Sequence, residues 1–157
     1  MALFYTDKSR TYGGRVGIGQ YRQMCIAEAN VAMTTAMIDN VDDEVGLFWL
    51  PKGAVVVGAT ISGTDMDSNG TPLLAFDVGD VAVESRLIAA SQVGRAATFS
   101  NALAPTGHLY KYTADTLIKA FVQAAAATAV AGTLSVAVHY FVDAEYSTTG
   151  VTATTTA

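Results

Sequence analysis

Apolar residues recur in short runs along the chain, and polar or glycine-containing turns separate these runs. The clearest run is 133–142, in which Leu, Val and Val occupy every second position at its start. Such alternation places successive side chains on opposite faces, as in a half-buried β-strand. The runs 45–50 and 54–61 are rich in β-branched or aromatic residues and are too short for a stable helix. A longer run, 109–122, also has β character, and its 113–115 stretch allows a break.

Turn residues mark the ends of these runs. Pro51-Lys52-Gly53 combines a proline that presets φ with a glycine that can adopt positive φ. The acidic stretch 39–44 and the polar stretch 65–70 also have the composition of turns. The run 73–78 is expected to form another short strand, closed by Gly79-Asp80.

Three segments allow more than one structure. Residues 21–38 permit a long strand, which could contain a bulge, although their Ala and Met residues also tolerate a helix. Residues 81–91 are expected to form a short helix or helical turn. The alanine-rich stretch 120–131 is either a helix capped by Gly132, or a strand end, a small-residue turn and a new strand. We favour the second interpretation because Phe121-Val122 continue a β-like run.

These elements predict a single all-β domain, a jelly-roll-like sandwich of two sheets, over residues 21–146. Residues 1–20 contain four glycines and are expected to form an extended arm. Residues 147–157 are expected to form a flexible tail rich in Thr and Ala. The predicted core consists of Val55, Val57, Ile61, Leu74, Phe76, Leu117, Phe121, Leu134, Val136 and Val138.

The composition favours a protein whose surface is covered by other subunits. Charged residues make up 15% of the chain and hydrophobic residues 51%, with a mean hydropathy of +0.33. Typical globular domains carry about 25% charged residues. Thr, Ser, Asn and Gly could supply a polar coat instead. No apolar run approaches the roughly 20 residues of a membrane span, and the N-terminus lacks the pattern of a secretory signal. Cys25, the single cysteine, is expected to be a buried structural thiol.

The net charge of −5 is unevenly distributed along the chain. Residues 1–22 carry four basic side chains and one acidic one, whereas residues 23–157 carry five basic and thirteen acidic ones. A basic arm on an acidic body suggests docking on an acidic protein surface. Nucleic acid is a weaker candidate partner because its phosphates would repel the acidic body. The remaining alternative is that residues 1–22 are a chain terminus whose charges have no binding role. The expected interface residues are Phe4, Tyr5, Lys8, Arg10, Tyr12, Arg15, Tyr21 and Arg22.

One loop has part of a calcium-binding pattern. Asp65, Asp67 and Asn69 occupy the first, third and fifth positions of a calcium loop, and Gly70 follows them. The bidentate Glu required at position twelve is replaced by Phe76. Because Asx residues followed by glycine also form ordinary turns, we favour an ordinary loop and expect no bound metal.

No recognisable catalytic motif is present in the sequence. It has no Gly-x-Ser-x-Gly elbow and no Walker loop, and Gly17-Ile-Gly19 lacks the third glycine of a dinucleotide-binding site. His108 and His139 form no local metal motif. A distant set such as His108 with Asp77 or Asp80 is not favoured by its spacing. We therefore expect no catalytic residues, no cofactor and no enzymatic activity, and a hydrolase is the weakest alternative.

The aromatic residues suggest contact surfaces. Adjacent pairs such as Phe48-Trp49 and Tyr140-Phe141 point to opposite faces of a strand. One member can fill the core while the other faces outward as an interface anchor or as a platform for a sugar ring. The last option makes a carbohydrate-binding module an alternative function.

The order of several segments carries a family resemblance. The segments are 50–56 (Leu-Pro-Lys-Gly-Ala-Val-Val), 60–62 (Thr-Ile-Ser), 74–80 (Leu-Ala-Phe-Asp-Val-Gly-Asp), 110–116 (Tyr-Lys-Tyr-Thr-Ala-Asp-Thr) and 131–140 (Ala-Gly-Thr-Leu-Ser-Val-Ala-Val-His-Tyr). Their succession resembles small virion structural proteins of tailed bacteriophages, of the head decoration or cement type. The resemblance implies a sandwich repeated many times on a particle, made in the host cytoplasm and located on the capsid. Its implied partners are the major capsid protein or other virion subunits, and the protein is expected to form a homo-oligomer. We expect it to bind neither nucleic acid nor a membrane. A tail or fibre component is the alternative within this class.

Overall fold

The computed structural model describes residues 24–143, which form strands and single-turn 3-10 helices. The strands in chain order are β1 (Cys25–Met33), β2 (Glu44–Leu50), β3 (Ala54–Gly63), β4 (Ala75–Asp80), β5 (Val83–Ser91), β6 (Phe99–Ser100), β7 (Thr116–Ala124) and β8 (Gly132–Val142). The 3-10 helices, η1 (Thr35–Met37) and η2 (Val93–Arg95), lie in connections. The predicted all-β class is confirmed. Within the described residues, no helix has the length and apolar character needed to cross a membrane.

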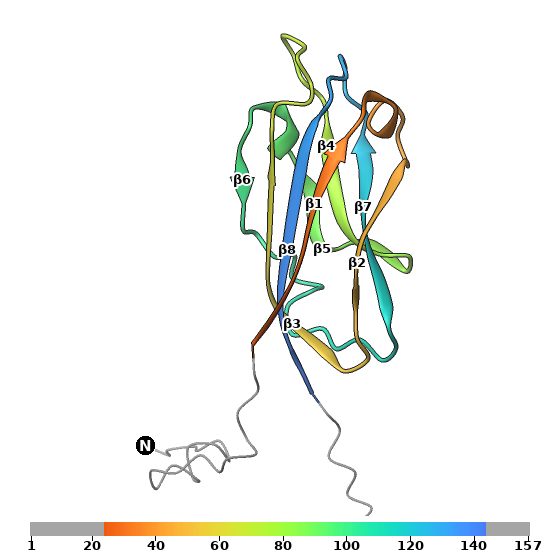
Figure 1. Ribbon diagram of the computed structural model, residues 1–157, viewed down its shortest axis with the longest axis vertical. Coiled ribbons are helices and arrows are strands. Elements are labelled where there is room, and N and C mark those ends of the chain that lie inside the picture. The colour runs from red at the N-terminus through yellow and green to blue at the C-terminus, as the bar shows by residue number, and fades with distance from the viewer. Residues whose placement is uncertain (1–23, 144–157) are drawn as a thin grey trace, which may run out of the picture.

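Two four-stranded antiparallel sheets form the layers of the sandwich (Figure 1). Sheet 1 has the strand order β1-β8-β3-β6, and sheet 2 has the order β2-β7-β4-β5. The chain pairs first with last: β1 with β8, β2 with β7, β3 with β6 and β4 with β5. The β3–β8 and β4–β7 ladders then join these strand pairs into sheets. This eight-stranded double-sheet arrangement is a jelly roll, as the sequence predicted.

The hydrophobic core lies between the two sheets. Its largest fully buried side chains are Phe76, Met33, Ile38, Leu50, Ile61, Met66, Leu74, Leu87, Ile88, Ile118, Leu134 and Val56. The predicted core residues that are buried are Val55, Ile61, Leu74, Phe76, Phe121, Leu134, Val136 and Val138. Burying one large aliphatic or aromatic side chain contributes about 1.5–3 kcal/mol, so this core is the main source of stability.

Two predicted core positions are wrong, because Val57 and Leu117 are only half-buried. A β-bulge lies between Val56 and Gly58, where β3 pairs with β8. The extra residue shifts the alternation of inward and outward side chains by one, so Val56 is fully buried instead of Val57. In β7 the inward positions are those of Ile118 and its alternate neighbours, and Leu117 lies on the opposite face.

The helix predicted at 81–91 is also wrong, because Val83–Ser91 form strand β5. The β4 ladder supplies hydrogen bonds to the β5 backbone, and both Leu87 and Ile88 are buried. Tertiary pairing thus overrides a weak local preference. Gly79-Asp80 likewise lie inside β4 and do not form the turn after it. In the 21–38 segment the strand occupies Cys25–Met33, pairs with β8 without a bulge, and gives way to η1.

The alanine-rich stretch 120–131 follows the favoured interpretation. Strand β7 ends at Ala124, and β8 begins at Gly132. The loop between them is held by backbone hydrogen bonds from Ala126 N–H to the Ile38 carbonyl (2.9 Å) and from Val130 N–H to the Met66 carbonyl (3.0 Å). These distant partners satisfy amides that a helix would have satisfied locally.

Replacing Gly79 by alanine should disrupt the β4–β5 hairpin. A Cβ at this position would collide with the carbonyl oxygens of Val83 and Glu84 and lie 2.8 Å from the Arg86 nitrogen. We expect Gly79→Ala to lower the free energy of unfolding by about 2–4 kcal/mol. Urea unfolding followed by circular dichroism measures this loss. Gly70→Ala is the matched control, because its Cβ would meet nothing within 4 Å. Equal stability of the two variants would contradict the close approach at Gly79.

Candidate functional site

The interface predicted in the N-terminal arm lies outside the residues that the structure describes. Its members are Phe4, Tyr5, Lys8, Arg10, Tyr12, Arg15, Tyr21 and Arg22. The place where the described chain begins is clear: Cys25 pairs with Tyr140, near the end of β8. The first and last described residues therefore lie at the same end of the sandwich (Figure 1).

A buried carboxylate, that of Asp67, ties two loops together. Its Oδ2 accepts hydrogen bonds from the N–H groups of Leu73 (2.7 Å), Leu74 (3.1 Å) and Ala127 (3.0 Å). Its Oδ1 accepts one from Thr128 N–H (2.8 Å). Leu73 and Leu74 lie just before β4, and Ala127 and Thr128 lie in the loop before β8. One side chain thus sets the positions of both loops.

The ionised form of Asp67 is strongly favoured in the folded protein. Burial by itself would raise the pKa of this carboxyl group, but the hydrogen bonds from Thr128, Ala127, Leu73 and Leu74 lower it far below the ordinary value of 3.8. Several backbone donors on one carboxylate commonly have this effect. The negative charge is therefore a structural element of the fold.

The 65–70 loop consists of Asx turns. Asp65 Oδ1 accepts a hydrogen bond from Asp67 N–H (3.2 Å), and Asn69 Oδ1 accepts one from Thr71 N–H (2.9 Å). Oxygens that would have to face a calcium ion thus bind amides of the chain itself. Among the residues described, no group of three or more His, Cys, Asp or Glu side chains could hold a metal. The ordinary-loop interpretation accounts for all three side chains.

A second buried ionic group joins β4, β5 and the 109–112 segment. Asp80 forms an ion pair with Arg86, and the Arg86 guanidinium lies 3.9 Å from the centre of the Tyr110 ring. Tyr110 packs edge-on against Tyr112, with ring centres 5.0 Å apart. Burial alone would raise the pKa of the Asp80 carboxyl group, but the hydrogen bond from Arg86 and those from two backbone amides lower it below its ordinary value. Burial and the charge of Asp80 raise the pKa of the Tyr112 hydroxyl.

The 50–56 segment, which contains the turn between β2 and β3, packs against this cluster. Gly53 has a φ of +85°, and its N–H donates to the Tyr112 carbonyl (2.7 Å). Lys52 N–H donates to Asp115 Oδ1 (2.8 Å). Val56 N–H donates to the Tyr110 carbonyl (3.1 Å), so the 109–112 segment covers one edge of β3. Segments that carry the phage resemblance are therefore scaffold elements.

No catalytic arrangement forms around the histidines in the described part of the chain. Asp80 is paired with Arg86, and Asp77 Oδ1 accepts the Ala90 N–H (2.6 Å). Both carboxylates that the sequence allowed as partners of His108 thus have structural roles. His139 lies on β8 beside Gly58, where a Cβ would approach its Nδ1 to 3.1 Å.

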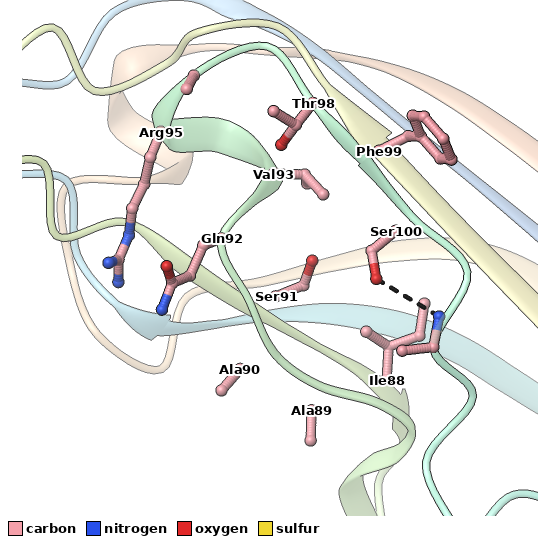
Figure 2. A pocket seen from close by; sticks show the side chains of 12 residues that line it. Ile88, Ala89, Ala90, Ser91, Gln92, Val93, Arg95, Thr98, Phe99 and Ser100 are labelled. Atoms are coloured by element: carbon pink, nitrogen blue, oxygen red, sulfur yellow. Dashed lines mark hydrogen bonds between the residues drawn. The ribbon is translucent and has the colours of Figure 1, made fainter.

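A shallow hollow of about 490 Å³ lies between β5 and β6 (Figure 2). Arg95 is the charged residue in its lining, and its guanidinium donates to the carbonyls of Leu73 (2.8 Å) and Leu74 (2.7 Å). Ser91 contributes a buried hydroxyl, and Phe99, which is 74% exposed, forms part of the rim. The hollow can receive a side chain of another molecule, but its lining contains no acid–base pair for catalysis.

The members of each adjacent aromatic pair lie on opposite faces of their strand. Phe48 packs against the core, whereas Trp49 is 63% exposed on β2. Tyr140 also packs against the core, and Phe141 occupies the other face of β8. Trp49 is therefore available for contact with another molecule.

Sheet 1 is almost free of charge, a feature that the sequence reading missed. Its three long strands β1, β3 and β8 contain a single charged residue, Glu28. On the outer face, Glu28 of β1 lies in one row with Ala137 of β8 and then Thr60 of β3. The neighbouring row is Ile26, His139 and Gly58. The signal was present in the strand sequences, but only the strand order shows that they share one sheet. Sheet 2, by contrast, contains both acidic and basic residues on its strands.

The fold is shared with chains of phage capsids. A chain of the cyanophage Pam1 capsid asymmetric unit is 32% identical, with a TM-score of 0.73 over 90% of this chain and 100% of that chain. A chain of the Ralstonia phage GP4 capsid is 25% identical, with a TM-score of 0.65 over 78% of this chain and 85% of that chain. A chain of the acidic stable capsid of Helicobacter pylori bacteriophage KHP30 shares the fold, with 16% identity and a TM-score of 0.51 over 77% and 89% of the two chains.

The protein is thus a structural component of a phage particle. With 32% identity to all of the Pam1 capsid chain, it belongs to the same family of phage capsid components. Comparisons with protein-family models and with curated proteins yield no match. A non-enzymatic structural role agrees with the geometry of the described residues.

Asp67→Asn should destabilise the sandwich strongly. In the variant, an amide nitrogen would face backbone N–H groups whose hydrogen bonds the carboxylate oxygens now accept, and the charge that attracts these donors would be lost. We expect a loss of about 3 kcal/mol or more in the free energy of unfolding, measured by urea unfolding at pH 7. Asp65→Asn is the control, because Asp65 is exposed and accepts one hydrogen bond. If both variants lost the same small amount, Asp67 would not hold the loops.

The effect of Asp67 should depend on pH in a defined direction. Its pKa is lower in the folded protein than the ordinary 3.8, so its stabilisation is complete above that value and declines as the pH falls below it. The stability difference between the native protein and Asp67→Asn should be constant from pH 7 to about 5 and narrow below about 4. Thermal unfolding across this range measures the difference. A difference that stayed constant down to pH 2.5 would contradict the lowered pKa.

Proposed function

We propose that this protein is a decoration, or cement, subunit that binds the assembled capsid shell and stabilises it. The observation that carries the proposal is the placement of the chain ends. Strand β1 starts and β8 finishes at one end of the sandwich, so residues 1–23 and 144–157 both continue from that end. A folded body whose basic arm continues from one end is suited to stand on a surface built by other subunits.

The proposed partner is the major capsid protein or another subunit of the shell. The sequence of residues 1–22 has a net charge of +3, whereas residues 23–157 have a net charge of −8. Such an arm would be attracted to an acidic protein surface, and charge complementarity mainly increases the rate of association. Exposed ion pairs contribute only about 0–1 kcal/mol each. The aromatic residues of the arm should therefore provide most of the binding energy.

The body contributes in a different way. The strands of sheet 1 carry little charge and Trp49 exposes an apolar ring, so these surfaces interact weakly with water. Such surfaces suit a protein that packs against neighbouring subunits on a particle. Low charge is unfavourable for a free soluble monomer. We propose that the arm attaches the protein and that the sandwich supplies shape and contact with further copies.

Deleting residues 2–20 should abolish binding to the particle and leave the sandwich folded. The measurement is co-sedimentation of purified protein with phage particles that lack it, together with the temperature at which those particles release their genome. The full-length chain should co-sediment and raise that temperature. Deleting residues 147–157 is the matched control and should retain binding. If the arm-deleted protein bound particles as tightly as the full-length chain, the attachment surface would lie on the sandwich. If the full-length chain bound isolated tails only, the protein would be a tail component.

Aromatic and basic residues of the arm should contribute unequally. Replacing Phe4, Tyr5, Tyr12 and Tyr21 by alanine should weaken particle binding by about a hundredfold or more, because buried aromatics dominate interfaces. Replacing Lys8, Arg10, Arg15 and Arg22 by glutamine should weaken it by about tenfold or less and reduce its dependence on salt. Titration of labelled protein onto particles at two ionic strengths separates these effects. A larger loss in the glutamine variant would contradict the proposed balance, and retention of the full-length protein on a glycan array would favour the sugar-binding alternative.

A further inference from the structure

The hollow between β5 and β6 lies where an edge of one sheet faces an edge of the other. Strand β5 is an edge of sheet 2, strand β6 is an edge of sheet 1, and the hollow between them measures about 490 Å³ (Figure 2). The buried side chains of Ile88 and Val93 belong to its lining, together with exposed alanines at 89, 90, 96 and 102. A hollow of this volume is within the range of ligand-binding pockets.

The hydroxyl group of Ser91 lies in this hollow without a partner. Ser91 is 7% exposed, and its Oγ is buried with no hydrogen-bond partner among the described residues. Figure 2 shows this hydroxyl in the space bounded by Val93 and Ser100. Buried polar groups in proteins are almost always hydrogen-bonded, and an unpaired one costs free energy. A ligand that brought a hydrogen-bonding group to Ser91 would remove this cost.

Strand β6 offers backbone hydrogen bonds beside the same hollow. It consists of Phe99 and Ser100, which line the hollow, and it pairs with β3 on one side. Within the described part of the chain, no backbone hydrogen bond from outside that ladder reaches either residue. An edge strand with unpaired N–H and C=O groups can pair with an extended segment. The hollow therefore suits a peptide that lies along β6.

The chemistry of the lining favours an uncharged peptide with small side chains. Arg95 is the charged residue of the lining, and its guanidinium already donates to the carbonyls of Leu73 (2.8 Å) and Leu74 (2.7 Å). No carboxylate is among the lining residues, so a lysine or arginine of the peptide would find no partner there. The alanines of the lining leave room for a backbone to approach closely.

The sequence that follows the described residues contains a segment of this kind. Residues 151–157 read Val-Thr-Ala-Thr-Thr-Thr-Ala, which has no charge and is rich in β-branched side chains that favour strands. Strand β8 ends where its Val142 pairs with Ala54 of β3, and Ile61 of β3 pairs with β6. At the rise of a strand, Ala54 and Ile61 are about 23 Å apart. Residues 144–157 span up to about 46 Å when extended, so the last of them can reach the hollow.

We propose that the hollow between β5 and β6 is a binding site for an extended, uncharged peptide, and that residues 151–157 of the same chain occupy it as an added strand beside β6. This strand is antiparallel to β6, because β6 runs toward the end of the sandwich from which the segment comes. It gives the Ser91 hydroxyl a partner and pairs the open side of β6. The site goes beyond attachment of the arm to the particle and does not depend on it.

Two aspartates in the docking segment test the proposal in the full-length chain. Thr152→Asp with Thr154→Asp introduces charge into the segment that the hollow receives. Thr148→Asp with Thr149→Asp introduces the same charge just before it and is the matched control. Ser91→Ala, which removes the hydroxyl, is combined with each pair and is also made alone, and urea unfolding measures the folding equilibrium constant.

The effect of Ser91→Ala should depend on the docking segment. In the unsubstituted chain and in the control, we expect this change to lower the folding equilibrium constant about fivefold, because a hydrogen bond to the segment is lost. In the chain with Thr152→Asp and Thr154→Asp, it should leave the constant unchanged or raise it, because the hydroxyl there has no partner to lose. The same effect in all backgrounds would overturn the proposal, since Ser91 would then act only within the sandwich.

A nitroxide spin label on the segment shows directly where it lies. The label is attached to Ala157→Cys in a Cys25→Ser background, and NMR relaxation identifies the backbone amides near it. We expect broadening of the amides of residues 89–92 and 98–100 when the isotope-labelled chain itself carries the nitroxide. When spin-labelled chains are mixed with isotope-labelled chains that lack the nitroxide, these amides should stay sharp.

The remaining outcomes separate this proposal from its alternatives. Absence of broadening would leave the segment outside the hollow, and broadening in the mixed sample would place the segment on another copy; either result overturns the proposal. Retention on a glycan array that Ser91→Ala abolishes would assign the hollow to a sugar instead. Particle co-sedimentation is measured separately, so failure of the arm to attach leaves this assignment intact, and an empty hollow leaves the proposed attachment intact.

Discussion

The structure depends on the position of the last strand, β8, in the middle of sheet 1. It pairs with β1 on one side and with β3 on the other. The strands β1 and β3, both from the first half of the chain, therefore belong to one sheet only because β8 lies between them. The β1–β8 pairs lie 99 to 115 positions apart in the chain and the β3–β8 pairs 71 to 88. Closing such large loops costs conformational entropy before the ladder stabilises them. Cooperative formation of the sandwich therefore requires accurate placement of the segment that enters β8.

Asp67 supplies this placement. Its carboxylate holds the amides of Ala127 and Thr128 a few residues before β8 starts, and it simultaneously holds those of Leu73 and Leu74 before β4. A charged acceptor buried among backbone donors is strong because little water competes for it. One acidic side chain in a polar loop thus links the segments that enter β8, a central strand of sheet 1, and β4, a central strand of sheet 2.

The distribution of charge is consistent with a subunit that packs against other subunits on a particle. Buried carboxylates are used to stabilise the fold, as at Asp67 and in the Asp80–Arg86 pair, whereas the long strands of sheet 1 carry almost no charge. Such a surface gives a solitary protein little solubility, but it costs little to desolvate when subunits pack together. The segments that carry the resemblance to phage virion proteins, such as 50–56 and 74–80, make turns and ion pairs inside the sandwich. The resemblance in these segments therefore reflects the shared fold and gives no direct information about the attachment surface.

The sequence by itself determined the β class, the turn at Gly53, most of the core and the strand–turn–strand path through 120–131, because these follow from local alternation, turn chemistry and burial of apolar side chains. It also determined the charge contrast between arm and body. Only the tertiary structure decided the strand order, the helix-versus-strand outcome at 81–91 and the bulge that exchanges Val57 for Val56 in the core. It alone showed that Asp67 binds distant amides and that β6 lies at an edge of sheet 1. These features arise from backbone groups that meet across long stretches of chain, and neither propensity nor local pattern contains information about such partners.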